Sequence, residues 1–268
     1  IYLISDSTGE TLDRIFLALK AQFNNFNYKI NHFSFTRTEN QIAKILENCK
    51  KTQKNIILYT IVDNKLGTFL NKETKKKNIP CFSVLGDLIN NFSNLLNQDS
   101  LNVPSRQHIL DDDYYKKIDA IQFTMNHDDG NAMSDIEKSD IILIGVSRTS
   151  KTPTSIYLAN KGYKVSNIPI VNKNSIPENI KKNKFKKCII GLIAEPERLA
   201  EIRKNRMNSL KEAGNQKYTN LQKIQDEVES SKNIFIKLKW PVIDVSRKSV
   251  EETAASVIKI YEIRNKNA

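Results

Sequence analysis

The segment from Ser139 to Ser155 constrains the fold of this chain most strongly, because three structural signals follow one another in it. Ile141 to Ile144 form a short apolar run typical of a buried strand, and Gly145 begins a turn. Lys151 and Thr152 then stand at the start of a predicted helix. A strand, a tight loop and a helix N-terminus in this order direct backbone N–H groups and the helix dipole at an anion, so the segment predicts a phosphate site.

The chemistry expected of this loop is that of a nucleotide site. The ammonium of Lys151 would neutralise phosphate oxygens, and the hydroxyl of Thr152 would help hold Mg²⁺. The spacing is that of G-x-x-x-x-G-K-T, except that Ser150 stands where a second glycine is expected. Serine tolerates a positive φ poorly, so the loop geometry is expected to differ, and an ordinary βα turn with an exposed lysine remains the alternative. The predicted nucleotide-binding residues are Gly145, Val146, Ser147, Arg148, Thr149, Ser150, Lys151 and Thr152.

The rest of the chain alternates short apolar runs with helical patterns, which predicts an α/β fold built from parallel βα units in two halves. The N-terminal α/β domain is expected over residues 1–96. A linker and a connecting helix follow over 97–139, and a P-loop kinase-like α/β domain over 140–268. The segment 218–231 reads as one helix, because apolar residues recur on one face of it.

The composition of the chain excludes or disfavours several functional classes of protein. The net charge of this 268-residue chain is +12, but its lysine runs are short, dispersed and not interleaved with aromatic residues, so nucleic acid is not the expected partner. No apolar run approaches the roughly 20 residues of a membrane span, and no secretory signal is recognisable. Three cysteines lie far apart without metal-like spacing. These features favour a cytoplasmic protein with free thiols.

Four motifs carry a resemblance to a known family. They are Ile4–Thr11, His127–Gly130, Gly145–Ser155 and Pro241–Val245, in this order along almost the whole chain. Together they resemble the regulatory proteins of pyruvate, phosphate dikinase and of phosphoenolpyruvate synthase. The resemblance implies a bifunctional enzyme that phosphorylates a threonine beside a catalytic histidine of its target, with ADP as donor. It also implies removal of that phosphate by inorganic phosphate, which releases pyrophosphate. The segment Ser7–Thr11 looks like the dikinase branch rather than the synthase branch.

Site roles follow partly from the residues and partly from this resemblance. Phosphoryl transfer requires positioning and charge neutralisation, for which Lys151 is the main candidate. A base near the threonine hydroxyl would help the kinase direction, and Asp128 and His127 are the candidates. The alternative for these two residues is a solvated turn and a helix C-cap. Asp6 and Asp244 follow apolar runs and would hold Mg²⁺ or water, or else cap helices. Four arginines would meet phosphates or serve packing: Arg37, Arg198, Arg203 and Arg247.

The sequence leaves several functional alternatives open. The same chemistry on phosphoenolpyruvate synthase is one of them. A small-molecule P-loop kinase that uses ATP is another, because the lysine loop alone does not fix the donor. A nucleic-acid-binding module is motivated only by the net charge. A homodimer is compatible with the sequence, which contains no signal that decides the oligomeric state.

Overall fold

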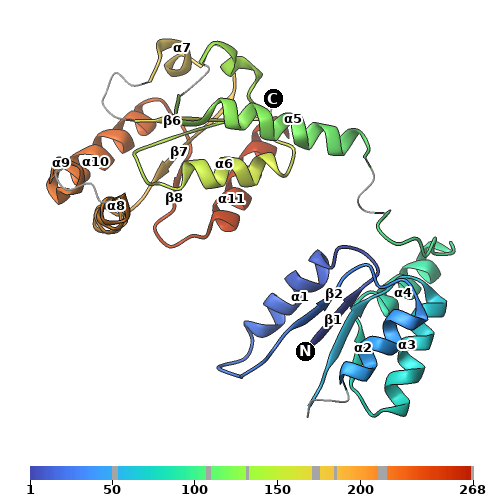
Figure 1. The fold of residues 1–268 in the computed structure, drawn as a ribbon. Helices are drawn as coiled ribbons and strands as arrows, with labels where there is room; N and C mark the ends of the chain where they lie inside the picture. The colour runs from blue at the N-terminus through green and yellow to red at the C-terminus, as the bar shows by residue number, and fades with distance from the viewer. Residues whose placement is uncertain are drawn as a thin grey trace. The chain divides into compact units, whose positions relative to one another are not determined.

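The computed structural model describes residues 1–49, 54–106, 110–130, 133–170, 176–183, 186–210 and 216–266. The chain divides into two compact units, Ile1–Ile109 and Leu110–Ala268, which are described separately below (Figure 1). Each unit contains a four-stranded sheet whose strands are all parallel. The α/β class with two βα-rich halves, predicted from the alternating pattern, is therefore confirmed.

The sheet of the first unit has the strand order β2-β1-β3-β4. Its helices cover both faces, as parallel crossover connections require. One face packs against α2 and α3 through Ile42, Ile45 and Leu70, and the other packs against α1 through Leu12 and Phe16. The elements are β1 (Tyr2–Ser5), α1 (Glu10–Lys20), β2 (Asn31–Phe33), α2 (Glu39–Cys49), β3 (Ile57–Thr60), α3 (Asn64–Lys76), β4 (Cys81–Ser83) and α4 (Gly86–Leu96).

The sheet of the second unit has the strand order β6-β5-β7-β8, which is the same relative order as in the first unit. Its strands alternate with helices along the chain. The elements are α5 (Asp112–Asn126), η2 (Asp128–Gly130), η3 (Met133–Lys138), β5 (Ile141–Gly145), α6 (Lys151–Ala159), β6 (Val165–Pro169), α7 (Glu178–Lys181), β7 (Cys188–Ile193), α8 (Pro196–Leu210), α9 (Gln216–Thr219), α10 (Leu221–Lys237), β8 (Val242–Asp244) and α11 (Val250–Lys266).

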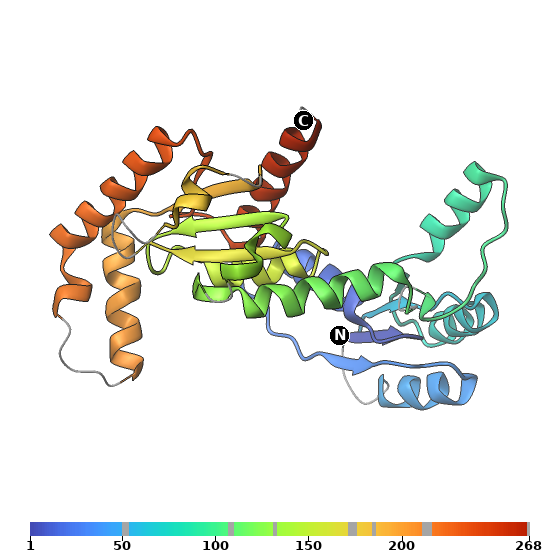
Figure 2. The same ribbon diagram turned by 90° about the horizontal axis from the view of Figure 1, so that it is seen from above.

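Two apolar cores enclose the second sheet. On one face, side chains of β5 and β7 such as Leu143 and Ile190 pack against α6, α8 and α11. On the other face, Ile142 and Ile189 pack with Phe235 of α10. All five residues of β5 are buried, which explains the continuous apolar run in its sequence. Helix α8 contacts α10, and α5 contacts α6, as both views of the ribbon show (Figure 1, Figure 2).

The single helix predicted over 218–231 is wrong, because two helices occupy this part of the chain. Asn220 interrupts them and caps α10, its side chain accepting a hydrogen bond from the backbone N–H of Lys223 at 3.0 Å. Helix α10 then continues to Lys237, beyond the predicted end. The short elements η2, η3 and α7 carry too little periodicity to be predicted from sequence.

Helix α5 lies in the second unit, where it contacts α6 and β6. The boundary between the two units falls between residues 109 and 110, inside the segment 97–139 that the sequence predicted to connect two domains. The side chain of Asp111 caps the start of α5 by accepting from the N–H of Tyr114. Within the described part of the chain, no helix combines the length and apolar character needed to cross a membrane.

Candidate nucleotide site

The loop between β5 and α6 leaves the second sheet at a topological switch point. Strand β5 pairs with β6 on one side and with β7 on the other. The connection after β5 leads to β6 on one side of this point, and the connection after β7 leads to β8 on the other. Ligands of open parallel sheets bind at the carboxyl ends of the strands beside such a point. The loop predicted from sequence therefore occupies the position that favours ligand binding in this topology.

The start of the loop requires glycine. A Cβ on Gly145 would lie 2.5 Å from the carbonyl oxygen of Leu192 and 2.9 Å from Oγ1 of Thr149. Thr149 is fully buried and donates its hydroxyl hydrogen to the carbonyl oxygen of Val146 at 3.0 Å, which closes the loop on itself. Ser150 has a φ of 56° and so adopts the left-handed conformation in place of the expected second glycine.

Lys151 is the first residue of α6 and points back into the loop. Its side chain is only 5% exposed, and its Nζ donates to the carbonyl oxygen of Val146 at 2.9 Å. Burial lowers the pKa of Lys151 to about 8, although the nearby carboxylates of Asp129 and Asp128 act in the opposite direction. The amine is therefore held in the loop at a position where an anionic ligand would stabilise its charged form.

Thr152, Asp128 and Asn167 form a polar cluster beside the loop. The Thr152 hydroxyl lies 3.0 Å from Oδ1 and 3.2 Å from Oδ2 of Asp128, to which it donates. The amide nitrogen of Asn167 donates to the same carboxylate and, at 3.0 Å, to Oγ1 of Thr152. This pairing orients the Asn167 amide, whose Oδ1 is buried without a hydrogen-bond partner.

The cluster fits a divalent cation of the kind that accompanies a nucleotide. It contains a carboxylate, a hydroxyl and an unsatisfied carbonyl oxygen, all of them the hard oxygen donors that Mg²⁺ prefers. Among the described residues, no group of three or more His, Cys, Asp or Glu side chains is placed to hold a metal. A site with few protein carboxylates is typical of Mg²⁺, which also binds substrate phosphates and water.

His127 ends helix α5 and is buried. Its ring stacks on Phe123 with centroids 3.8 Å apart, and its Nδ1 lies 2.8 Å from the carbonyl oxygen of Phe123. A hydrogen bond to this carbonyl oxygen requires the proton on Nδ1, and the other ring nitrogen, Nε2, is buried without a hydrogen-bond partner. The His127 carbonyl oxygen also accepts from the N–H of Asn167 at 3.0 Å. This position matches the C-cap alternative considered from sequence.

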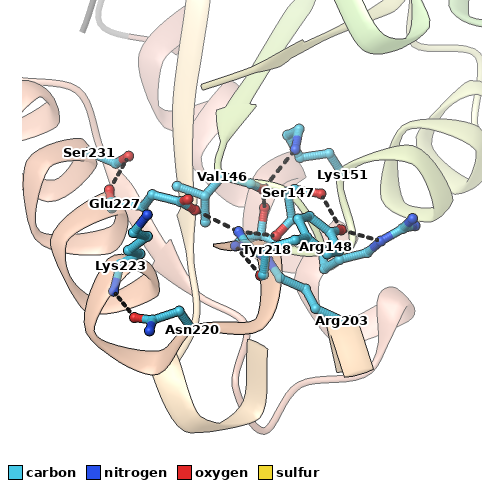
Figure 3. Close-up of polar contacts among 11 residues, drawn as sticks. Val146, Ser147, Arg148, Lys151, Arg203, Tyr218, Asn220, Lys223, Glu227 and Ser231 are labelled. Atoms are coloured by element: carbon cyan, nitrogen blue, oxygen red, sulfur yellow. Dashed lines mark hydrogen bonds and ion pairs between the residues drawn. The ribbon is translucent and has the colours of Figure 1, made fainter. Parts of the chain in front are cut away.

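A second network attaches the loop to α8, α9 and α10 (Figure 3). The hydroxyl of Tyr218 lies 3.1 Å from Oγ of Ser147 and accepts from Nε of Arg148 at 3.2 Å. Arg203 is 1% exposed, and its guanidinium donates to the carbonyl oxygens of Ser147 and Tyr218 and pairs with Glu227 at 2.7 Å. Arg203 also lies 4.8 Å from the centre of the Tyr218 ring. The loop is thus held by helices that follow it in the chain.

The loop borders a cavity of about 300 Å³. Two of the lining side chains are cationic, Arg148 and Lys151, and Asp129 is the only acid among the described lining residues. His127 and Asp128 are not among those residues, so the structure brings them near the loop without placing them on the cavity wall. The lining consists of Asp129, Ser147, Arg148, Ser150, Lys151, Thr152, Pro153, Pro169 and Ile202.

The two other strand-end acids stabilise local backbone. Asp6 is buried, and its carboxylate accepts from the N–H of Val62 at 2.7 Å, while burial raises its pKa. Asp244 accepts from the backbone N–H and the hydroxyl of Ser246, which forms a tight turn after β8. Neither acid is the residue that precedes a helix. Arg37 donates to the carbonyl oxygen of Asp6 within the first unit.

Sequence reasoning missed Asn167, Tyr218 and Asp129 as site residues. One feature of the sequence could have indicated Asn167, namely a polar residue near the carboxyl end of an apolar strand. No sequence feature indicates Tyr218, because its role depends on contacts with residues 70 and 71 positions away. Of the candidate arginines, Arg203 is buried against the loop, whereas Arg198 and Arg247 are exposed.

Comparison with known proteins identifies the family of this chain. The family described as Kinase/pyrophosphorylase matches residues 1–258. A protein of Pelagibacter ubique (strain HTCC1062), named "Putative pyruvate, phosphate dikinase regulatory protein", is 64% identical over 267 residues, which cover 100% of this chain and 97% of the relative. Proteins of the same name from Brucella anthropi and Rhizorhabdus wittichii are each 42% identical over 266 residues, covering 99% of this chain and 96% of each relative. The chain therefore belongs to the kinase/pyrophosphorylase family.

Proposed function

We propose that this protein is a bifunctional regulator of pyruvate, phosphate dikinase. In one direction it transfers the terminal phosphoryl group of ADP to a threonine of the dikinase and inactivates it. In the other it removes that phosphate with inorganic phosphate, releases pyrophosphate and restores activity. The observation that carries the proposal is the loop between β5 and α6, where buried Lys151 faces a cavity at the switch point of the sheet.

The loop has the properties that a diphosphate requires. Backbone N–H groups at the N-terminus of α6 and the helix dipole favour an anion. Lys151 and Arg148 add positive charge to the cavity wall. Lys151 donates to Val146 in the free protein, so the amine is already positioned and needs only to exchange a carbonyl oxygen for a phosphate oxygen. Residues Gly145 to Thr152 would bind ADP in this way.

A magnesium ion would be held by Thr152, with Asp128 and the free carbonyl oxygen of Asn167 beside it. When bound, it would neutralise part of the diphosphate charge. The residues of this chain would then keep the nucleotide in one orientation: Thr152 at the helix start, and Asp128 by holding the η2 turn against that start. Each of these contacts positions the donor for in-line transfer.

One anion site serves both reactions in this proposal. ADP presents its β-phosphoryl group as the terminal one, so the loop must hold the group that is transferred. In the removal reaction the attacking inorganic phosphate would occupy the position of that group. A single site then makes the protein sensitive to the ratio of ADP to phosphate without a separate sensor.

The dikinase is the favoured target because the relatives that cover almost the whole chain carry its name. The segment Ser7–Thr11 supports the same branch. Phosphoenolpyruvate synthase is the alternative target. A small-molecule kinase that uses ATP is the alternative reaction, because the loop alone does not determine which nucleotide is the donor.

The test is a donor comparison with purified protein and dikinase. The proposal predicts phosphothreonine on the dikinase and AMP as the product when ADP is supplied. It further predicts that inorganic phosphate then removes the modification with one pyrophosphate formed per threonine restored. Transfer from ATP alone, or modification of phosphoenolpyruvate synthase but not of the dikinase, would overturn the respective part of the proposal.

A further inference from the structure

We infer that Asp129 is the general base that accepts the proton of the target threonine. The inference rests on the proposed function and adds a catalytic residue to it. The sequence pointed instead to Asp128 or His127 as the base. Three observations favour Asp129: the engagement of both of those side chains, the position of Asp129 on the cavity wall, and the backbone conformation that directs it there.

The carboxylate of Asp128 is already engaged. It accepts from the Thr152 hydroxyl at both oxygens and from the amide nitrogen of Asn167 at Oδ1. Donors that occupy the oxygens of a carboxylate leave it less accessible to the proton of a substrate hydroxyl. Asp128 is therefore suited to hold Thr152 and the η2 turn in place.

His127 is not placed to reach a bound protein substrate either. Its imidazole is buried, stacked on Phe123 and hydrogen-bonded through Nδ1 to the Phe123 carbonyl oxygen. It is not among the described residues that line the cavity. A base must come within hydrogen-bond reach of the proton that it removes. The buried ring of His127 does not meet that requirement.

Asp129 lies on the cavity wall, where it can come within hydrogen-bond reach of a substrate hydroxyl. It is exposed, and within the described part of the chain no hydrogen bond or ion pair engages its carboxylate. It lines the cavity together with Ser150, Lys151 and Thr152. The free carboxylate and the phosphate-binding amine therefore face the same space.

The backbone separates the two neighbouring acids. Asp129 has a φ of 51° and a ψ of 33°, in the left-handed region, and Gly130 follows with a φ of 79°. The left-handed conformation is unfavourable for residues other than glycine, and such residues cluster at functional sites. The turn directs Asp128 to Thr152, while Asp129 lines the cavity.

In the step that Asp129 would assist, the threonine Oγ forms a bond to the β-phosphorus of ADP. The bond from that phosphorus to the bridging oxygen breaks, and AMP leaves with the electron pair. The threonine proton passes to the carboxylate of Asp129 and is later released to water. In the removal reaction, inorganic phosphate supplies the proton that the departing threonine oxygen needs, so that direction depends less on Asp129.

The test compares Asp129→Asn with Asp128→Asn in the full chain. For Asp129→Asn, we expect kcat of the kinase reaction to fall by about 10²–10⁴-fold, with unchanged ADP affinity by calorimetry and a smaller loss in phosphate-dependent removal. Asp129→Glu should recover part of the rate. For Asp128→Asn, we expect weaker ADP binding in the presence of Mg²⁺. Asp135→Asn, which changes a partly exposed acid paired with Lys138, is the control and should behave as the parent.

The outcomes separate this inference from the function on which it rests. An active parent with near-normal kinase turnover in Asp129→Asn overturns the role of Asp129 alone. Loss of ADP binding in Asp129→Asn also overturns it, because a base is not needed for binding. A parent that transfers nothing from ADP overturns the proposed function and this role together, whereas the pattern described above supports both.

Discussion

The hydroxyl of Thr152 donates to the carboxylate of Asp128 at 3.0 Å, which ties the first turn of α6 to the turn that follows α5. This contact places two consecutive acids beside the lysine loop in different surroundings. Asp128 faces the helix start, and Asp129 lines the cavity. The Thr152–Asp128 contact thus joins the element that would bind the nucleotide to the element that would meet the protein substrate.

Gly145→Ala should destabilise the second unit and disturb the loop. The added Cβ would lie 2.5 Å from a backbone oxygen of β7, which has little freedom to move. Overpacking of this kind typically costs about 1–3 kcal/mol. Thermal unfolding and ADP titration would show both effects. Gly67→Ala in α3 is a matched control, because its Cβ would find no atom closer than 3.9 Å, and a helical alanine should be neutral or stabilising.

Tyr218→Phe should weaken ADP binding without unfolding the protein. The change removes the hydroxyl that contacts Ser147 and Arg148 but keeps the ring beside Arg203. Loss of about 1 kcal/mol per hydrogen bond corresponds to a several-fold rise in the dissociation constant. Tyr114→Phe, at an exposed position on α5, is the control. An affinity equal to that of the parent would mean that the Tyr218 hydroxyl does not organise the loop.

The strand–loop–helix segment was predictable because its signals are local. The apolar run of β5, the small residue after it and the lysine at the helix start are adjacent in sequence and need no distant contact. The break at Asn220 was missed because apolar spacing continues across it, and only the capping hydrogen bond to Lys223 ends one helix and begins another. Periodicity reports which face is apolar and is less informative about where a helix begins.

The site was predictable only in part, because its remaining residues meet through tertiary contacts. Asn167 lies 15 residues from Thr152 and 39 from Asp128, and its role depends on the pairing of β5 with β6. The choice between Asp128 and Asp129 depends on the positive φ of Asp129. No sequence pattern specifies which of two adjacent acids a left-handed residue will turn toward a cavity.

Binding of ADP should be linked to proton uptake above pH about 8. Burial lowers the pKa of Lys151 to about 8, so the free protein loses this charge as the pH rises through that value. A bound diphosphate favours the charged amine and raises its pKa, so ADP binds with uptake of up to one proton in that range. Affinity should then fall by as much as about tenfold per pH unit. Calorimetry in two buffers of different ionisation enthalpy measures the proton directly.

A pH-independent affinity with no proton uptake would contradict this assignment. Lys151→Arg provides a comparison, because arginine stays charged throughout the range. Its ADP affinity, whatever its absolute value, should not fall with pH in the way that the parent's does. A parallel decline in parent and variant would locate the titrating group elsewhere.

ADP should inhibit the removal reaction by competing with inorganic phosphate. Both anions would occupy the position held by the loop and Lys151, so the apparent affinity of each should decrease as the other increases. Steady-state rates of pyrophosphate release at several ADP concentrations test this. Noncompetitive inhibition, or tight binding of both anions at once in a calorimeter, would require two separate sites.

The most direct test of the account is to follow the β-phosphorus of ADP. Purified protein is incubated with dikinase and ADP labelled in the β-phosphate, and the labelled residue is mapped by mass spectrometry. The account predicts one labelled threonine on the dikinase, equimolar AMP, and transfer lowered by about 10²–10³-fold or more in Lys151→Ala, which lacks the charge that faces the transferring group. Label that stays on the nucleotide, or equal labelling by parent and Lys151→Ala, would contradict it.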